Sequence, residues 1–216
     1  MTKHAHRLKL LTAVSALLAL SPLPALAVGN PHNIRGTITS VNGDTFSIKE
    51  TDGTAAKIEL AGNASIVSVA KAKLSDIKPG DYIGTAATPR VDGTLQAIEV
   101  HIFPKSMVGA GEGTRAWDLK RKSSMTNGTV GRRSGGRVAD NKVNTVAGDS
   151  ITVDYKGGSK KVLITPSTKV VSLVPGSRAE LKPSAQVFVV GATENSDGSL
   201  EAHRITVGTK DLPPPM

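Results

Sequence analysis

The sequence predicts an all-β protein built from two small antiparallel barrels in tandem, and three observations support this fold class. Apolar residues alternate with polar ones over short segments, as at Phe46 and Ile48, and a period of two indicates half-buried strands. Asn-Gly, Asp-Gly and Pro-Gly turn signals recur at the short intervals typical of antiparallel sheets. The third observation is a repeat: "VNGDTFSIKETDG" from Val41 returns as "VAGDSITVDYKGG" from Val146.

The repeat extends beyond this hairpin, because "LSDIKPGDYI" is echoed by "RAELKPSAQV", and "DGTLQAIEVHI" by "DGSLEAHRITV". We therefore expect residues 28–106 and 137–208 each to form one barrel. Closing a short sheet into a barrel hides its edges and fills the interior with Val, Ile and Leu. An OB-like barrel is the first expectation and an open sandwich the second. One helical turn at most is expected in each copy, near Leu74–Ile77 and Arg178–Leu181.

Residues 1–27 have the layout of a cleaved secretory signal. A basic head with Lys3, Arg7 and Lys9 precedes the apolar run Leu10–Leu20, which is about half of the ~20 residues needed to span a bilayer. We expect cleavage after Ala27 and a periplasmic or secreted protein that does not span the membrane. The chain has no cysteine, so disulfides and thiolate metal sites are excluded.

The positive charge of the expected mature chain is concentrated between the two copies. Residues 115–142 carry eight basic and two acidic side chains, whereas residues 28–114 carry eight and nine and residues 143–216 carry eight and seven. We assign residues 107–136 to a basic linker that contains Gly, Ser and Trp117, and residues 209–216 to a Pro-rich tail.

The candidate partner-binding residues lie in this linker. They are Arg115, Trp117, Asp118, Lys120, Arg121 and Lys122. An indole beside a guanidinium offers flat faces for a ligand, and a flexible cationic segment attracts anionic polymers by counterion release. Two alternatives stay open. Trp117 fills the groove between the barrels while Arg115 pairs with Asp118, or the segment is a solvated linker that maintains solubility.

Glu99 and His101 are candidates for metal binding. They are two residues apart in a predicted strand, so they share one of its faces, opposite Val100 and its apolar neighbours. The pair could hold Zn or Cu if a third ligand came from elsewhere in the chain. The second copy has Arg204 and Thr206 at the matching positions, so the pair is not duplicated. The alternative is a solvated strand face.

Neither an enzyme nor a nucleic-acid-binding protein is expected from the remaining residues. The sequence contains no serine elbow, no histidine-rich helix and no phosphate loop. OB-like folds bind single strands by stacking bases on exposed aromatic side chains, whereas we expect Phe46 and Phe188 to be core residues. We therefore predict no catalytic residue and no cofactor.

Four segments carry a resemblance to a known family: "GTITSVNGDTFSIKETDG", "LSDIKPGDYIG", "DGTLQAIEVHIFP" and "GEGTRAWDL…SSMTNGTV". Together they resemble a family of exported bacterial proteins with tandem OB-like repeats, known as a domain of unknown function, over nearly all of the mature chain. Some relatives are labelled metal ABC transporter permease, which this chain cannot be, because no stretch beyond the signal is apolar enough to span. The family implies no catalytic residues. The stretch from Gly131 to Asn141 looks expanded relative to the family pattern, which leaves the first strand of the second copy unassigned.

The function expected from the sequence is that of a non-catalytic periplasmic binding or assembly protein. Its partner would be an anionic envelope component or another periplasmic protein that meets the central basic segment. The alternative is a periplasmic metal-handling accessory protein that uses Glu99 and His101.

Overall fold

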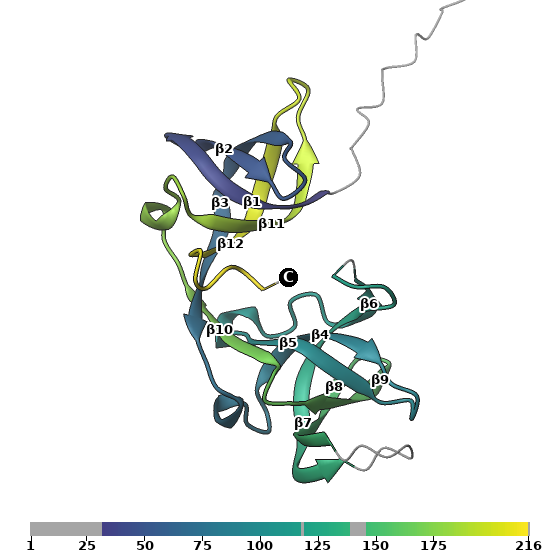
Figure 1. Ribbon diagram of the computed structural model, residues 1–216. Coiled ribbons are helices and arrows are strands. Elements are labelled where there is room, and N and C mark those ends of the chain that lie inside the picture. The colour runs from purple at the N-terminus through teal and green to yellow at the C-terminus, as the bar shows by residue number, and fades with distance from the viewer. Residues whose placement is uncertain (1–31, 118, 139–145, 216) are drawn as a thin grey trace, which may run out of the picture.

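The computed structural model describes residues 32–117, 119–138 and 146–215 (Figure 1). The predicted signal and Asp118 lie outside these ranges. Within them, no helix is both long and apolar enough to cross a membrane.

The described chain consists of strands and short 3-10 turns, so the all-β prediction is confirmed. The strands up to residue 102 are β1 (His32–Asn42), β2 (Thr45–Glu50), β3 (Ala55–Lys71), β4 (Tyr82–Pro89) and β5 (Leu95–Ile102). The later strands are β6 (Gly113–Ala116), β7 (Ser124–Val138), β8 (Val146–Tyr155), β9 (Gly158–Ile164), β10 (Lys169–Pro175), β11 (Gln186–Glu194) and β12 (Leu200–Gly208). The 3-10 turns η1 (Leu74–Asp76) and η3 (Arg178–Glu180) lie where helical turns were predicted, and η2 (Lys105–Met107) was not predicted.

Five strands form a closed barrel, the first barrel of the molecule. Its order is β12-β11-β1-β2-β3, and a parallel pairing of β12 with β3 closes it, from Leu200↔Ile58 to Val207↔Ser68. The alternation read from the sequence fills its interior, since Phe46 and Ile48 are almost fully buried in one apolar cluster. Closure leaves none of these five strands as a free edge.

A second ring of strands forms the other lobe seen in Figure 1. Its order is β5-β4-β7-β8-β9, and a short parallel pairing closes it at Leu95↔Val162 and Gln96↔Leu163. A separate apolar cluster lies within this lobe and includes Ile83, Val100 and Val153. Parallel pairs close both rings, whereas antiparallel barrels were predicted.

Each lobe combines strands from both halves of the chain. β1–β3 are completed by β11 and β12, while β7–β9 are completed by β4 and β5. The chain crosses between the lobes at β3 and β10, which pair antiparallel from Val171↔Lys71 to Pro175↔Val67. The prediction that residues 28–106 and 137–208 each form a barrel is therefore not confirmed. Alternation shows which face of a strand is buried, but it does not show which strand lies beside it.

The segment predicted as a linker, residues 107–136, is largely part of the sheet. β6 and most of β7 lie in it, and β7 pairs with β4 from Tyr82↔Thr129 to Ala87↔Ser124. A basic side chain of this segment also has a defined place, because Arg133 Nε donates to Asp149 Oδ2 at 2.9 Å. Residues 107–136 therefore supply one wall of the second lobe instead of a tether between two barrels.

The shared strands predict how the two halves behave when separated. We expect that fragments divided between Val108 and Gly109 will not fold as monomers, because each lacks the strands that close its ring. When co-expressed, the fragments should associate one to one and unfold cooperatively. Light scattering and circular dichroism of the separate and combined fragments test this. Two monomeric fragments that each melt cooperatively and do not associate would contradict the strand exchange.

Candidate functional site

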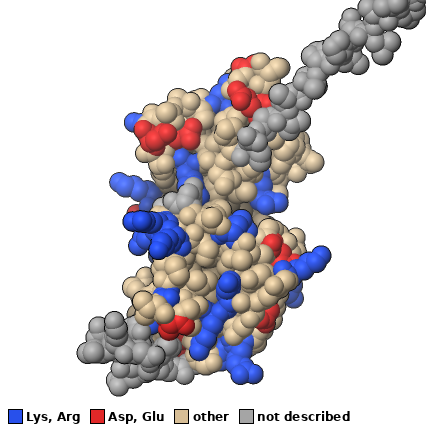
Figure 2. Space-filling view, turned by 90° about the vertical axis from the view of Figure 1, so that its right-hand side faces the viewer, with Lys and Arg blue, Asp and Glu red and all other residues tan. Residues whose placement is uncertain are grey.

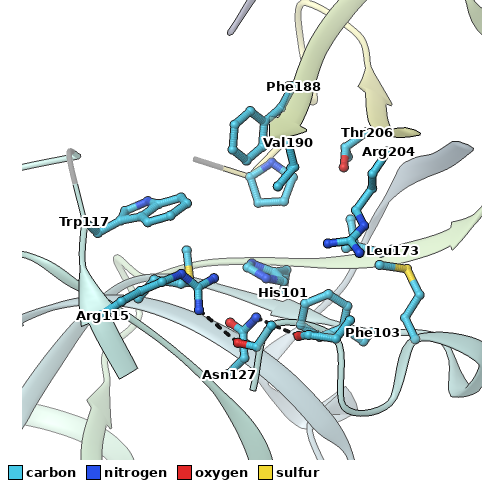
Figure 3. Close-up of a pocket in the computed structure, with 15 residues that line it drawn as sticks. His101, Phe103, Arg115, Trp117, Asn127, Leu173, Phe188, Val190, Arg204 and Thr206 are labelled. Atoms are coloured by element: carbon cyan, nitrogen blue, oxygen red, sulfur yellow. Dashed lines mark hydrogen bonds between the residues drawn. The ribbon is translucent and has the colours of Figure 1, made fainter. Parts of the chain in front are cut away.

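A pocket lies between the two lobes (Figure 3). Its volume is about 80 Å³, roughly half that of the ~150 Å³ engineered cavity that accommodates benzene. The first barrel contributes Phe188, Arg204 and Thr206, and the second lobe contributes aromatic and polar side chains that include His101 and Trp117. The pocket therefore exists only because the two lobes are packed against each other.

The wall from the first barrel is a row of side chains on its outer face. Arg35 of β1 pairs with Phe188 of β11, and Phe188 pairs with Thr206 of β12. Val187 and Val189 point into the barrel core, so the intervening Phe188 points outward. Phe188 is buried, as predicted, but it is the second lobe that covers it and not the interior of the first barrel. The Arg35 guanidinium lies 4.4 Å from the centre of the Phe188 ring.

The wall from the second lobe is a matching row on strands β5, β4 and β7. Gly84 pairs with His101 on one side and with Asn127 on the other. A Cβ at Gly84 would overlap His101 Nε2 and would lie 2.8 Å from Asn127 Oδ1. Only glycine leaves space there, so the imidazole lies over the β4 backbone. The His101 ring meets Phe103 edge-on, with 4.8 Å between ring centres.

Trp117 connects the two walls. Its backbone follows β6 and is held to Ser123 by two hydrogen bonds: Trp117 N donates to Ser123 O at 2.9 Å, and Ser123 Oγ donates to Trp117 O at 2.8 Å. The indole meets Phe188 of the other lobe edge-on at 6.3 Å. Arg35 and Arg115 each place a guanidinium 5.5 Å from the indole centre. Trp117 thus fills the groove, as one alternative predicted, and it also lines the pocket.

The other predicted partner-binding residues are placed differently. Lys120, Arg121 and Lys122 are exposed in the turn between β6 and β7, and they do not line the pocket. Lys120 N donates to Ser123 Oγ at 3.0 Å, so this turn is ordered by the same serine as Trp117. The predicted pair between Arg115 and Asp118 falls partly outside the described residues. Arg115 donates a hydrogen bond to the carbonyl oxygen of Gly111, at 2.9 Å.

The pocket is basic. Arg115 and Arg204 both line it, and Figure 3 shows their guanidinium groups on either side of His101. Neither Asp nor Glu lines it in the part of the chain that the structure describes. Lys and Arg side chains also gather on the surface at the groove between the lobes (Figure 2). From the sequence, Arg204 was recognised only as the counterpart of Glu99. No local signal indicates that β12 faces the second lobe across a groove.

Three buried polar atoms at the pocket have no hydrogen-bond partner among the described residues: His101 Nδ1, Trp117 Nε1 and Asn127 Oδ1. Buried polar groups in native proteins are nearly always paired, and an unpaired one costs about 1–3 kcal/mol. Burial, and secondarily the charge of Arg115, lowers the pKa of His101 to about 4. His101 is therefore neutral near pH 7, and its unpaired Nδ1 either donates or accepts a hydrogen bond, depending on the tautomer.

Glu99 and His101 do share a strand face, but that face is not solvated. Both side chains are buried, at 5% and 7% exposure, so the alternative of a solvated face is wrong. Glu99 Oε2 lies 3.5 Å from Lys169 Nζ. Across residues 32–117, 119–138 and 146–215, no three His, Cys, Asp or Glu side chains are grouped to hold a metal ion. A third metal ligand, which the metal hypothesis requires, is not supplied by the described residues.

The buried His101 predicts a loss of stability in mild acid. Its pKa is about 4 in the folded protein against an ordinary 6.5, so the unfolded chain binds the extra proton first and stability falls as pH drops from 6.5 to 4. The free energy of unfolding should fall by about 2 kcal/mol between pH 7 and pH 5. Carboxyl groups whose pKa is lowered by folding, such as Glu180, reduce stability mainly at pH values below their ordinary pKa of 4.5, so they contribute little to this change.

Urea unfolding at several pH values measures this slope, and His101→Gln provides the comparison. The variant should lose most of the slope between pH 6.5 and pH 5, because glutamine does not titrate. An equal slope in both proteins would show that the imidazole is not held neutral by its surroundings.

Comparison with known proteins identifies one similarity. The family described as "Domain of unknown function (DUF5666)" matches residues 137–206. This span runs from the end of β7 into β12, whereas the resemblance expected from the sequence covered nearly all of the mature chain. No curated protein and no solved structure matches the chain. The chain is thus similar to this family over residues 137–206.

Proposed function

We propose that the protein is a non-catalytic periplasmic binding protein that takes an anionic group of its partner into the pocket between the lobes. In this proposal two OB-like barrels act as rigid supports, Arg115 and Arg204 supply the charge, and Trp117 supplies a flat wall. The observation that carries the proposal is one pocket that combines two guanidinium groups with three buried polar atoms that have no hydrogen-bond partner among the described residues. The periplasmic location follows from the signal layout of residues 1–27.

The chemistry of the unpaired atoms favours an oxyanion. Trp117 Nε1 can only donate a hydrogen bond, and guanidinium groups also only donate. A carboxylate, phosphate or sulfonate offers several acceptor oxygens, and its hydrogen bonds to charged donors are the stronger kind. A bound anion would thus satisfy the indole and balance the charge of Arg115 and Arg204, with no carboxylate among the described lining residues to repel it.

Asn127 adds a second requirement for the ligand. Its Nδ2 donates to the carbonyl oxygen of Ala110 at 3.0 Å. That carbonyl can only accept, so the orientation of the amide is determined and Oδ1 is left as an acceptor. A ligand that presents a hydroxyl beside its acid group would complete the site. Hydroxy acids and acidic sugars have this combination.

The exposed basic triplet supports the same proposal from outside the pocket. Lys120, Arg121 and Lys122 lie on the turn that follows Trp117, so they add positive potential next to the site. Exposed charges of this kind accelerate the approach of an anion more than they hold it. An acidic polysaccharide or another anionic envelope component would meet the triplet first and place one acid group in the pocket.

The chain contains one tryptophan, so its fluorescence reports directly on the site. We expect glycolate to change Trp117 emission in a saturable way at constant ionic strength, and glycolamide, which has no charge, to have little effect. Arg115→Gln and Arg204→Gln should each weaken glycolate binding about tenfold, since a hydrogen bond to a charged group contributes ~1.5–3 kcal/mol.

The matched control is Lys161→Gln, which removes one exposed positive charge on β9, away from the pocket lining. It should leave the glycolate dissociation constant within about twofold, as expected for a distant screened charge. Equal weakening in all three variants would mean that only net charge matters. A lack of any saturable response to glycolate in the parent protein would refute the oxyanion site.

A further inference from the structure

We infer that the tail, here residues Thr209–Pro215, is a displaceable lid on the pocket between the lobes. The inference rests on the proposed function only in taking the pocket to be a ligand site. The position of the tail over the pocket is observed in the structure. Pro214 and Pro215 are buried and Pro215 lines the pocket. Figure 1 shows this end of the chain turned back between the two lobes.

A short turn directs the tail into the groove. Thr209 N donates to Leu212 O at 3.0 Å, and Leu212 N donates to Thr209 O at 3.2 Å and to Thr209 Oγ1 at 3.1 Å. Gly208 makes room for the turn, because a Cβ there would overlap Leu212 O and lie 2.9 Å from Pro214. The fold-back therefore depends on the absence of a side chain at Gly208.

Among the described residues, few hydrogen bonds join the tail to the lobes once it reaches the groove. The three prolines have no backbone N–H, so they donate no hydrogen bonds to either lobe. Lys169 Nζ donates to Pro213 O at 3.4 Å, and this lysine also lies 3.5 Å from Glu99. Proline-rich segments bind aromatic-lined grooves in this way, through shape and apolar contact with a low ordering cost. A ligand that makes similar apolar contacts can therefore displace the tail from the groove.

The lid limits which ligands the pocket can take. With Pro215 in place the volume is about 80 Å³, which suits a small acid such as glycolate but not an aromatic acid, since an engineered cavity that accommodates benzene has a volume of roughly 150 Å³. Leaving the groove, the tail would free the space beside Phe188 and Trp117. A larger anionic ligand must then compete with the tail. Its apparent dissociation constant is the intrinsic one divided by the fraction of molecules whose tail has left the groove.

The first experiment tests the lid without any ligand. A variant that ends at Thr209 loses Lys210 and Asp211 together, so its net charge is unchanged. Acrylamide should quench Trp117 fluorescence more strongly in this variant, because Pro215 no longer covers the pocket. The synthetic peptide Lys-Asp-Leu-Pro-Pro-Pro-Met should restore protection in the shortened protein and should not affect the full chain. Equal quenching in both proteins would overturn the inference.

A second variant opens the lid while every tail residue is kept. Gly208→Ala should raise acrylamide quenching as the truncation does, since its methyl group conflicts with Leu212 and Pro214. The matched control is Gly62→Ala, where a Cβ has no atom within 4 Å. If acrylamide quenches Trp117 equally in Gly208→Ala and Gly62→Ala, but more strongly in the truncated protein, then the turn at Gly208 does not position the tail.

Ligand size separates the lid from the oxyanion site. Benzoate should bind the truncated protein about tenfold more tightly than the full chain, as expected if most molecules are closed, while glycolate should change by less than about twofold. Failure of the Arg115→Gln and Arg204→Gln effects, with peptide rescue intact, would refute the proposed function and leave the lid. Identical benzoate affinities in the two proteins would refute the lid and leave the oxyanion site.

Discussion

Ring closure between strands from opposite halves of the chain is the constraint on which the rest of the structure depends. β12 closes the first barrel by parallel pairing with β3 over Leu200–Val207, and β5 closes the second ring on β9. Neither half contains all five strands of a ring, so neither can hide its own sheet edges. The chain must cross between the lobes at β3 and β10, and their antiparallel pairing joins the lobes by backbone hydrogen bonds. The relative placement of the lobes is therefore part of the fold, unlike that of two domains on a flexible linker.

The same constraint produces the pocket. Residues on the outer faces of the rings would meet solvent in isolated barrels, but here Phe188 and His101 are buried because the lobes are held together. Gly84 of β4 and Phe188 of β11 each occupy the middle of one of the two facing rows. Gly84 has no side chain, whereas Phe188 has a large ring. That difference makes the pocket asymmetric, because the Phe188 ring projects from the first barrel whereas Gly84 leaves room for the His101 imidazole on the second lobe. Trp117 then bridges the walls from the turn between β6 and β7.

The sequence was sufficient for the local structure and insufficient for the partners of each strand. Alternation at Phe46 and Ile48 predicted core positions that the structure confirms, and the 3-10 turns at Leu74–Asp76 and Arg178–Glu180 lie where they were expected. The exchange of strands could not be seen, because both halves carry the same alternation and either set of strands satisfies it. The burial of Phe188 was predicted but what buries it was not, since a run of apolar residues shows that both faces of β11 are covered and does not show by what. Trp117 was found because it is the one tryptophan of the chain, and Arg115 because it is near Trp117 in the sequence, whereas Arg204 needed the three-dimensional fold.

The exchange of strands is tested most directly by cysteine pairs, since the chain has no cysteine of its own. Thr37 of β1 pairs with Gln186 of β11, and Gln186 Nε2 donates to Thr37 Oγ1 at 2.8 Å. The double variant Thr37→Cys/Gln186→Cys should oxidise to one intramolecular disulfide in the folded monomer. The alternative pair is Thr37→Cys/Tyr82→Cys, because Tyr82 matches Gln186 in the sequence repeat and would replace it if each half formed its own barrel. Non-reducing electrophoresis should show a cross-link in the first variant and none in the second, and the reverse result would contradict the interleaved fold.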